Sequence, residues 1–129
     1  MPYSTEIVDG GRGILHVGRD IVTGEELIAS ADGVLEMVKG GSSPNYALTD
    51  LSEVVNLRVS PEEIRRNADI NIKISKYIRN AKVAIVAPRD HIYGNARMWQ
   101  AYTEQTGWIT QVFRSKDEAH EWIKETNSG

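Results

Sequence analysis

The residues best suited to chemistry lie close together in the chain, within residues 89–97. They are Arg89, Asp90, Tyr93, Gly94 and Arg97. A guanidinium such as that of Arg97 binds a carboxylate or phosphate through two parallel hydrogen bonds. Tyr93 adds an aromatic ring and a hydroxyl, and Gly94 lets a ligand or another backbone approach closely. This combination predicts a site for a small anionic or amphipathic molecule.

The elements around these residues support that prediction. Residues 83–87 are all apolar, which is typical of a strand buried on both faces of a parallel sheet, and Pro88 ends the strand because it has no N–H to donate. A helix follows, for which Asp90 is the expected N-cap. Ligands of α/β proteins bind where parallel strands end, and helix N-termini favour anions. The alternative is purely structural: Asp90 caps the helix, Arg97 pairs with a surface acid and Tyr93 packs.

No other stretch carries a catalytic or metal-binding pattern. The glycine clusters at 10–13 and 40–43 lack the lysine and hydroxyl residue that end a phosphate loop, and no serine lies in a nucleophile elbow. The histidines are scattered without ligand spacing, at His16, His91 and His120. We therefore expect no catalytic residue, no metal and no cofactor.

Length and composition limit the class of protein. A chain of 129 residues is long enough for one domain with its own core, and we assign residues 1–129 to a single domain. The formal net charge is -3 and there is no basic run, which argues against nucleic acid as a partner. No apolar stretch approaches the roughly 20 residues of a membrane span, and the N-terminus lacks a secretion signal. The absence of cysteine fits a reducing compartment, so we expect a cytoplasmic protein.

The order of strand and helix signals predicts the fold class. We expect strands at 3–8, 13–17, 46–51, 82–87 and 108–114. Three helices open on capping boxes, which pair Thr23 with Glu26, Ser60 with Glu63, and Ser115 with Glu118. A fourth helix should run from Asp90 to Gly107. The resulting order, ββαβαβαβα, predicts an α/β fold with a mixed, mainly parallel sheet of four or five strands flanked by four helices. The first strand should pair antiparallel at or near an edge.

The second helix carries an unusual polar row. It should run from residue 61 to about residue 80, with a charged face opposite a broad apolar arc. Within that arc lie Asn67, Asn71 and Ser75, spaced four residues apart. Buried amides need partners, since each unpaired one costs about 1–3 kcal/mol. The row therefore predicts either a polar-lined cavity or a contact with another copy of the chain, as in a homodimer; alternatively, part of the arc faces water.

Several segments of the chain resemble the SpoIIAA-like family of small bacterial proteins, which is grouped with the STAS and CRAL-TRIO-type lipid-binding folds. The residues that carry the resemblance are 22–27, Asp50 and Leu51, 82–88, Tyr93 and Gly94, 96–98, 112–115 and 118–122. It extends over about residues 7–123. The resemblance implies a mixed sheet flanked by helices and suggests a lipid-like ligand, but it implies no particular activity.

Anti-sigma-factor antagonists of the STAS class carry a phosphorylatable serine in an Asp-Ser-Ser-Gly motif, at the start of the helix after the central strand. Asp50 and the four residues after it resemble the lead-in to this motif, and we include Asp50 in the candidate site. The motif itself is absent, because residues 58–61 occupy its place. Ser60 lies there, but the capping box explains it as a structural cap, and Glu62 and Glu63 would repel a phosphate.

Three functions are open on the sequence alone. The first is a non-enzymatic binding or regulatory module for a small amphipathic or lipid-like ligand. The second is a STAS-type module that binds a protein partner through its surface. The third is an enzyme on a small anionic substrate, with Arg89 and Arg97 as anion clamps and Asp90 or His91 as the acid–base group. A closed apolar cavity beneath the second and third helices would favour the first, whereas an exposed apolar patch would favour a partner or a dimer.

Overall fold

Within the residues that the structure describes, 2–128, five strands and four helices follow each other in the predicted order. The computed structural model describes side chains up to residue 125. The elements are β1 (Tyr3–Val8), β2 (Gly13–Thr23), α1 (Gly24–Lys39), β3 (Tyr46–Arg58), α2 (Pro61–Ile74), β4 (Lys82–Val86), α3 (Asp90–Tyr102), β5 (Ile109–Phe113) and α4 (Lys116–Ser128). Short 3₁₀ turns, at Asp9–Gly11 and Glu104–Thr106, precede β2 and β5. The predicted α/β class and element order are confirmed.

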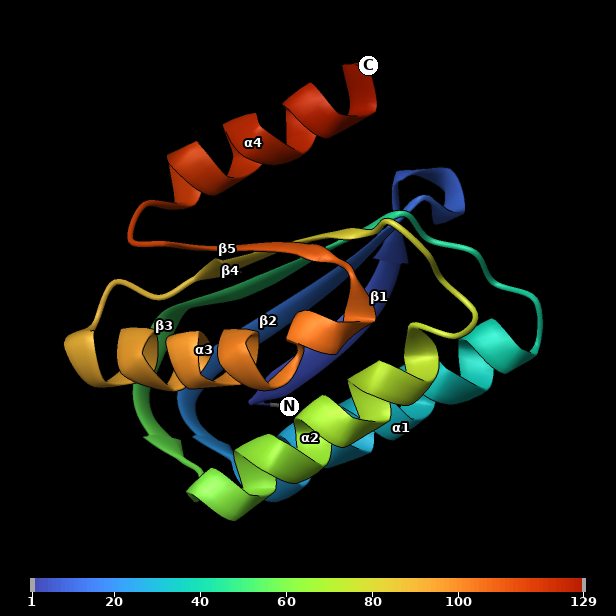
Figure 1. Cartoon of the computed structure of the whole chain (residues 1–129). Helices are drawn as coiled ribbons and strands as arrows, with labels where there is room; N and C mark the ends of the chain where they lie inside the picture. The colour runs from blue at the N-terminus through green and yellow to red at the C-terminus, as the bar shows by residue number, and fades with distance from the viewer. Residues whose placement is uncertain (1, 129) are drawn as a thin grey trace.

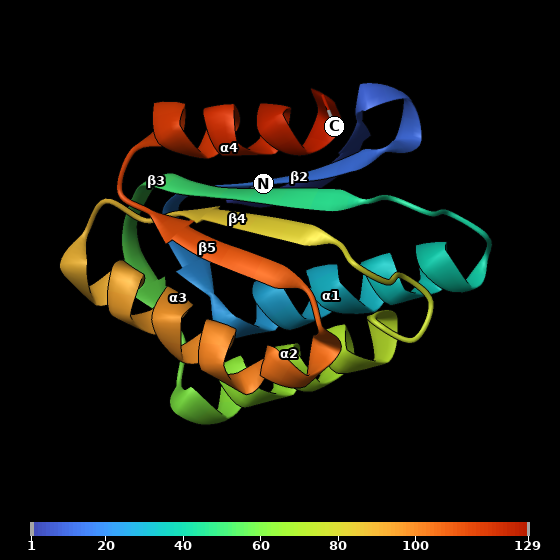
Figure 2. The same ribbon diagram turned by 45° about the horizontal axis from the view of Figure 1, so that its top comes forward.

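The strands form one mixed sheet in the order β1-β2-β3-β4-β5. β1 pairs antiparallel with β2 at one edge, and the other pairs are parallel, as predicted. β4 lies between β3 and β5, and residues 83–86 are buried, which explains their unbroken apolar run. Figures 1 and 2 show α4 alone on one face of the sheet, with α1, α2 and α3 on the other.

β2 and β3 are much longer than the sequence pattern predicted. The prediction ended these strands at residues 17 and 51, whereas they continue to Thr23 and Arg58. The ladder between them shifts register twice, between Val17 and Ile21 of β2. A bulge adds an unpaired residue and reverses the inward–outward alternation of the strand. The apolar pattern therefore breaks down although the pairing continues.

Two helices end earlier than predicted. α2 ends at Ile74, and the chain turns toward β4 through Asn80, which has a φ of 60°. One further hydrogen-bonded turn follows Ile74, and Ile78, buried in the same cluster as Ile74, then draws the chain toward the sheet. α3 ends at Tyr102, and the φ of 76° at Gly107 ends the 3₁₀ turn that follows it.

The core on the three-helix face of the sheet is divided into two clusters. One packs against α3 and consists of Val22, Leu51, Val54, Leu57, Val83, Ile85, Ala87, Ile92 and Ala96. The other packs against α1 and the end of α2 and consists of Ile14, Val34, Leu35, Val38, Ile74, Ile78 and Ala81. Trp108 contacts both clusters. Because a domain usually has one contiguous core, this division marks a place where the packing is interrupted.

The starts of α1 and α2 touch each other. Both open on the predicted capping boxes, in which the hydroxyl oxygen accepts from the glutamate N–H and the glutamate carboxylate accepts from the N-cap N–H. A Cβ added at Gly24, the first residue of α1, would lie 2.4 Å from Cδ of Glu63. The Glu63 side chain thus caps α2 while it fills the space that Gly24 leaves. At α4, the Ser115 hydroxyl accepts from the Glu118 N–H at 3.3 Å, which is half of the third predicted box.

Alanine substitutions at residues 24 and 33 of α1 should have opposite effects. Gly24→Ala displaces the Glu63 carboxylate from its capping box, so we expect a loss of about 1–2 kcal/mol of unfolding free energy. Gly33 has nothing within 4 Å of an added methyl, so Gly33→Ala should gain about 1 kcal/mol through helix propensity. Urea unfolding measures both changes. Equal effects of the two substitutions would contradict the close contact between the helix starts.

Candidate functional site

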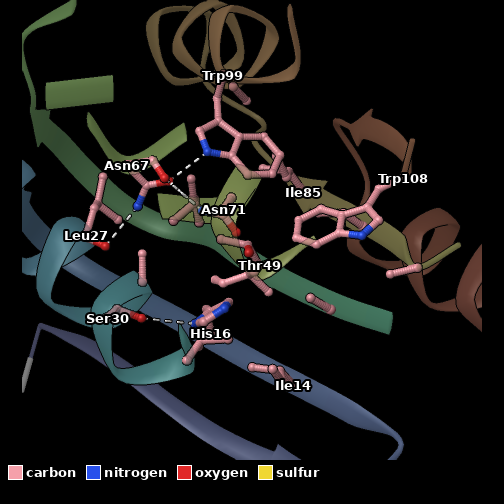
Figure 3. A pocket seen from close by; sticks show the side chains of 18 of the residues that line it. Ile14, His16, Leu27, Ser30, Thr49, Asn67, Asn71, Ile85, Trp99 and Trp108 are labelled. Carbon is pink, nitrogen blue, oxygen red and sulfur yellow. Dashed lines mark hydrogen bonds between the residues drawn. The ribbon is translucent and has the colours of Figure 1, made fainter. Parts of the chain in front are cut away.

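A cavity of about 150 Å³ lies between the sheet and the three helices on that face. Strands β2, β3 and β4 form its floor, and α1, α2 and α3 surround it (Figure 3). α2 acts as a roof because it packs mainly on α1 and α3 rather than on the sheet. Residues from both core clusters line the cavity, which is therefore the gap between them.

The cavity is small and its walls are mainly apolar. Ile14, Val34, Ile74, Ile85 and Trp108 are typical of its lining. Apolar cavities of about this volume stay dry and take up one benzene molecule or xenon atom. Pockets for drug-sized ligands are larger, about 300–1,000 Å³. The space therefore fits one ring or a short chain, and it is too small for a whole lipid.

The Asn67 side chain joins all three helices beside the cavity. Its Nδ2 donates to the Leu27 carbonyl of α1 at 2.8 Å, and its Oδ1 accepts from Nε1 of Trp99 on α3 at 2.7 Å. The same Oδ1 accepts from Nδ2 of Asn71, one turn later in α2, at 3.0 Å. Figure 3 shows these bonds converging on Asn67. Nearly all the hydrogen-bonding capacity of this amide is therefore used within the protein.

Two of the alternatives for the polar row and apolar arc of the predicted second helix hold together: part of the arc lines a polar-lined cavity, and part of it faces water, since Tyr77 is exposed. Asn67 and Asn71 line it together with Ile74. Ser75 does not line it, and its hydroxyl donates to the Ile72 carbonyl at 2.6 Å. The contact with a second copy of the chain stays a prediction.

His16 brings an imidazole from β2 to the cavity. Its Nδ1 lies 2.8 Å from Oγ1 of Thr5 and 3.4 Å from Oγ of Ser30, and these two hydroxyls lie 2.7 Å apart. The ring stacks on Tyr3, with centroids 5.7 Å apart. Burial lowers the pKa of His16 from 6.5 to about 4, so the imidazole is neutral at pH 7. Burial also raises the pKa of the Tyr3 phenol, against a smaller opposing effect of its hydrogen bond with Thr49.

The five candidate residues after Pro88 do not line this cavity. α3 turns Ala96 and Trp99 toward it, at helical spacing from the buried Ile92. Gly94 and Arg97 lie on the exposed side of the same helix. Arg97 therefore does not reach this cavity, because its position along the helix places it on the opposite side of α3.

Asp90 and Tyr93 instead belong to a surface cluster around Arg114. Arg89 is the N-cap residue of α3 and no side chain caps this helix, so the predicted capping role of Asp90 is wrong. The Arg114 guanidinium donates to the Asp90 carboxylate and to the Pro88 carbonyl, and it lies 4.2 Å from the centroid of the Tyr93 ring. α3 begins one residue too early for Asp90 to cap it, and the Asp90 carboxylate pairs with the guanidinium instead. A binding role for Arg89, Asp90, Tyr93, Gly94 and Arg97 stays a prediction.

Asp50 lies under the start of α4, away from the cavity. Its carboxylate accepts from the Ser52 N–H at 2.9 Å and the Ser52 hydroxyl at 2.6 Å, and it pairs with Nζ of Lys116 at 3.0 Å. Burial alone would raise the pKa of Asp50, but the Ser52 hydrogen bonds and the Lys116 charge outweigh burial and hold the pKa below its usual value. Asp50 is thus a buried, paired anion that fixes α4 to β3, and its role in ligand binding stays a prediction.

The sequence analysis missed His16, Ser30 and Trp99. One signal for His16 was present: it shares an inward strand face with Ile14 by alternation, and an inward histidine needs a hydrogen-bond partner. Its partners Thr5 and Ser30 lie 11 and 14 residues away in the chain. No local motif therefore connects the three residues.

No helix within residues 2–128 has both the length and the apolar character needed to cross a bilayer. Over the same residues, no three histidine, aspartate or glutamate side chains come together in a way that could hold a metal ion.

Three solved structures share this architecture. A DUF3478-family protein with a SpoIIAA-like fold from Shewanella loihica PV-4 gives a TM-score of 0.58 at 18% identity, covering 93% of this chain and 90% of that one. The anti-sigma factor antagonist SpoIIAA in its unphosphorylated form gives a TM-score of 0.56 at 6% identity, covering 95% of this chain and 97% of that one. The Bacillus cell fate determinant SpoIIAA in the phosphorylated form gives a TM-score of 0.54 at 6% identity, covering 94% of this chain and 98% of that one. Neither a family model nor a curated protein matches the sequence, so these likenesses establish the SpoIIAA-like fold alone.

His16 should make the protein less stable as the pH falls below neutrality. The unfolded chain binds a proton at this residue as the pH falls through 6.5, whereas the folded protein does so only near pH 4. Between these two pH values the unfolded chain binds more protons, so lowering the pH favours unfolding. We expect this group to remove about 2 kcal/mol of unfolding free energy between about pH 8 and pH 5. His16→Gln should abolish that part of the slope, as measured by urea unfolding across the pH range.

His120, exposed on α4, supplies the matched control. His120→Gln should give a curve of stability against pH that runs parallel to that of the wild type. If the curve of stability against pH of His16→Gln also runs parallel to that of the wild type, the imidazole of His16 is not held neutral by burial.

Proposed function

We propose that the protein is a non-enzymatic binding module that holds a small amphipathic ligand in the cavity beneath α1, α2 and α3. The observation that carries this proposal is the cavity itself, about 150 Å³ of space between two core clusters. Its apolar walls with a few placed polar groups have the general character of small-molecule sites. The cavity lies beneath the second and third helices, where such a space favours ligand binding over the other functions.

The apolar walls around this space lack the contacts of a filled core. A ligand that fills the space supplies those contacts, so the unfilled volume favours binding.

A second proposal is a STAS-type module that binds a protein partner through its surface. The fold likeness to SpoIIAA, an anti-sigma factor antagonist with a phosphorylated form, supports it. The exposed cluster of Asp90, Tyr93 and Arg114 is a surface that such a partner could contact. A phosphorylation switch at the start of α2 has less support, because the Ser60 hydroxyl accepts from the Glu63 N–H in the capping box.

An enzyme acting on a small anionic substrate has the least support. The carboxylate of Asp90 is bound by Arg114, and Arg97 lies on the exposed side of α3. Arg89 and Arg97, the anion clamps of this alternative, and Asp90 and His91, its acid–base candidates, are all exposed, and none of them lines the cavity.

The indole N–H signals of the three tryptophans test the ligand proposal in one spectrum. Trp99 and Trp108 line the cavity, whereas Trp122 belongs to α4, on the opposite face of the sheet, where it contacts the Phe113 ring. Toluene is small enough for the cavity and should shift the ¹H–¹⁵N signals of Trp99 and Trp108 in a saturable way, while that of Trp122 stays in place. Equal shifts of all three signals, or none, would contradict binding in the cavity.

Filling the cavity from within gives a matched pair of variants. Ala31 is buried and lines the cavity, whereas Ala101 is exposed on α3. Ala31→Leu should abolish the toluene-induced shifts with little change in folding stability, because the new side chain occupies the space. Ala101→Leu should bind toluene as the wild type does. Normal binding by Ala31→Leu would mean that the probe binds elsewhere.

A further inference from the structure

The lining of the cavity contains no ionised side chain. None of the described residues that surround it is a lysine, arginine, aspartate or glutamate. His16 is neutral because burial lowers its pKa, and burial raises the pKa of Tyr3 away from the neutral range. An ionised group on a ligand would have no counter-charge here, and burying an unpaired charge is strongly unfavourable. The walls therefore select against anions and cations.

Most polar groups of the lining already have partners. Asn67 is bonded to Leu27, Trp99 and Asn71, and Nε1 of Trp108 donates to the Ile78 carbonyl at 2.9 Å. These groups stabilise the walls and have little capacity left for a ligand.

His16 keeps an unused ring nitrogen, and the amides of Asn71 and Asn95 also keep capacity: Asn71 donates through its Nδ2, and no described residue bonds to its Oδ1 or to the Asn95 side chain. Nδ1 of His16 faces the hydroxyls of Thr5 and Ser30, and its Nε2 has no hydrogen-bond partner among the described residues. No fully buried side-chain nitrogen or oxygen of the described residues lacks a partner, so Nε2 is accessible, and His16 is among the residues that line the cavity. Figure 3 shows the imidazole reaching from β2 toward the side chains around the hollow.

We propose that the ligand is an uncharged molecule of about the size of toluene with one hydroxyl, or a similar neutral group, and that this group bonds to Nε2 of His16. The inference rests on the proposed function, because it names the ligand class of the same cavity. If the Thr5 hydroxyl donates to Nδ1, Nε2 carries the ring proton and donates; in the other tautomer, Nε2 accepts. A hydroxyl can bond to either form, whereas a carboxylate can bond only to the first and brings an unpaired charge.

Matched probes test the inference, with the Trp99 and Trp108 indole signals as the readout of binding at pH 7. Toluene and phenol differ only by a methyl and a hydroxyl of similar size. Benzamide and benzoate form a second pair of equal shape, one neutral and one anionic. We expect phenol to bind at least as tightly as toluene, and benzoate to bind at least about tenfold more weakly than phenol and more weakly than benzamide. Benzoate binding as tight as that of phenol would overturn the proposed neutrality of the ligand.

The variant His16→Leu isolates the hydrogen bond. Measured on the same variant, the preference for phenol over toluene, which is the ratio of their dissociation constants, should fall by about tenfold, since the phenol hydroxyl then lacks a partner. The wild-type protein gives an independent measurement: the ¹⁵N signal of Nε2 in His16 should shift with phenol and stay in place with toluene.

The outcomes separate this inference from the proposed function. If toluene and phenol bind with an unchanged ratio in His16→Leu, and the ¹⁵N signal of His16 does not respond to phenol, the role of His16 is overturned while the cavity stands as a binding site. If neither toluene nor phenol binds the wild-type protein, the proposed function and this inference both fail.

Discussion

The side-chain amide of Asn67 is the interaction on which the three-helix face of the sheet depends. It joins α2 to the Leu27 carbonyl of α1 and to the Trp99 indole of α3. An apolar residue at this position would leave the Trp99 N–H unpaired, at about 1–3 kcal/mol, and would remove the link to the Leu27 carbonyl of α1. Hydrogen bonds are directional, whereas apolar contacts are not. The amide therefore favours one arrangement of the three helices where apolar packing alone would permit several.

That arrangement explains why a cavity exists. The apolar residues on this face gather at two places, one under α3 and one under α1 and the end of α2, with Trp108 between them. α2 spans the gap while it packs mainly on its neighbouring helices. The protein thus has an apolar interior with a space that its own side chains do not fill, and a neutral histidine at its floor. These features favour a small uncharged ligand over the anionic ligand that Arg89 and Arg97 suggested.

The parts of the fold that the sequence predicted are those with local causes. Capping boxes at Thr23 and Ser60, and the apolar run of β4, each depend on residues within a few positions of one another. The continuation of β2 and β3 could not be predicted, because bulges hide the alternation of two paired strands. The ends of α2 and α3 were also missed, since tertiary burial rather than local propensity ends them.

The same distinction between local and long-range causes applies to the candidate site. The amide row of α2 indicated a polar-lined cavity because its four-residue spacing can be seen within one helix. His16 could not be linked to Thr5 and Ser30, because three separate elements bring them together. The prediction for Asp90 failed for a similar reason: its partner Arg114 follows another strand. The side chains suited to binding that the sequence indicated lie at the carboxyl ends of the strands. The space for a ligand lies elsewhere, between the sheet and the three helices.

The most direct test of a real binding cavity beneath α1, α2 and α3 is a crystal structure of the protein under xenon pressure. Xenon enters dry apolar cavities of about this volume without needing any polar partner. We predict an anomalous peak enclosed by Asn71, Trp99 and Trp108, with the Asn67 hydrogen bonds intact. A structure without the peak, in which the two core clusters meet across the gap, would contradict the central claim.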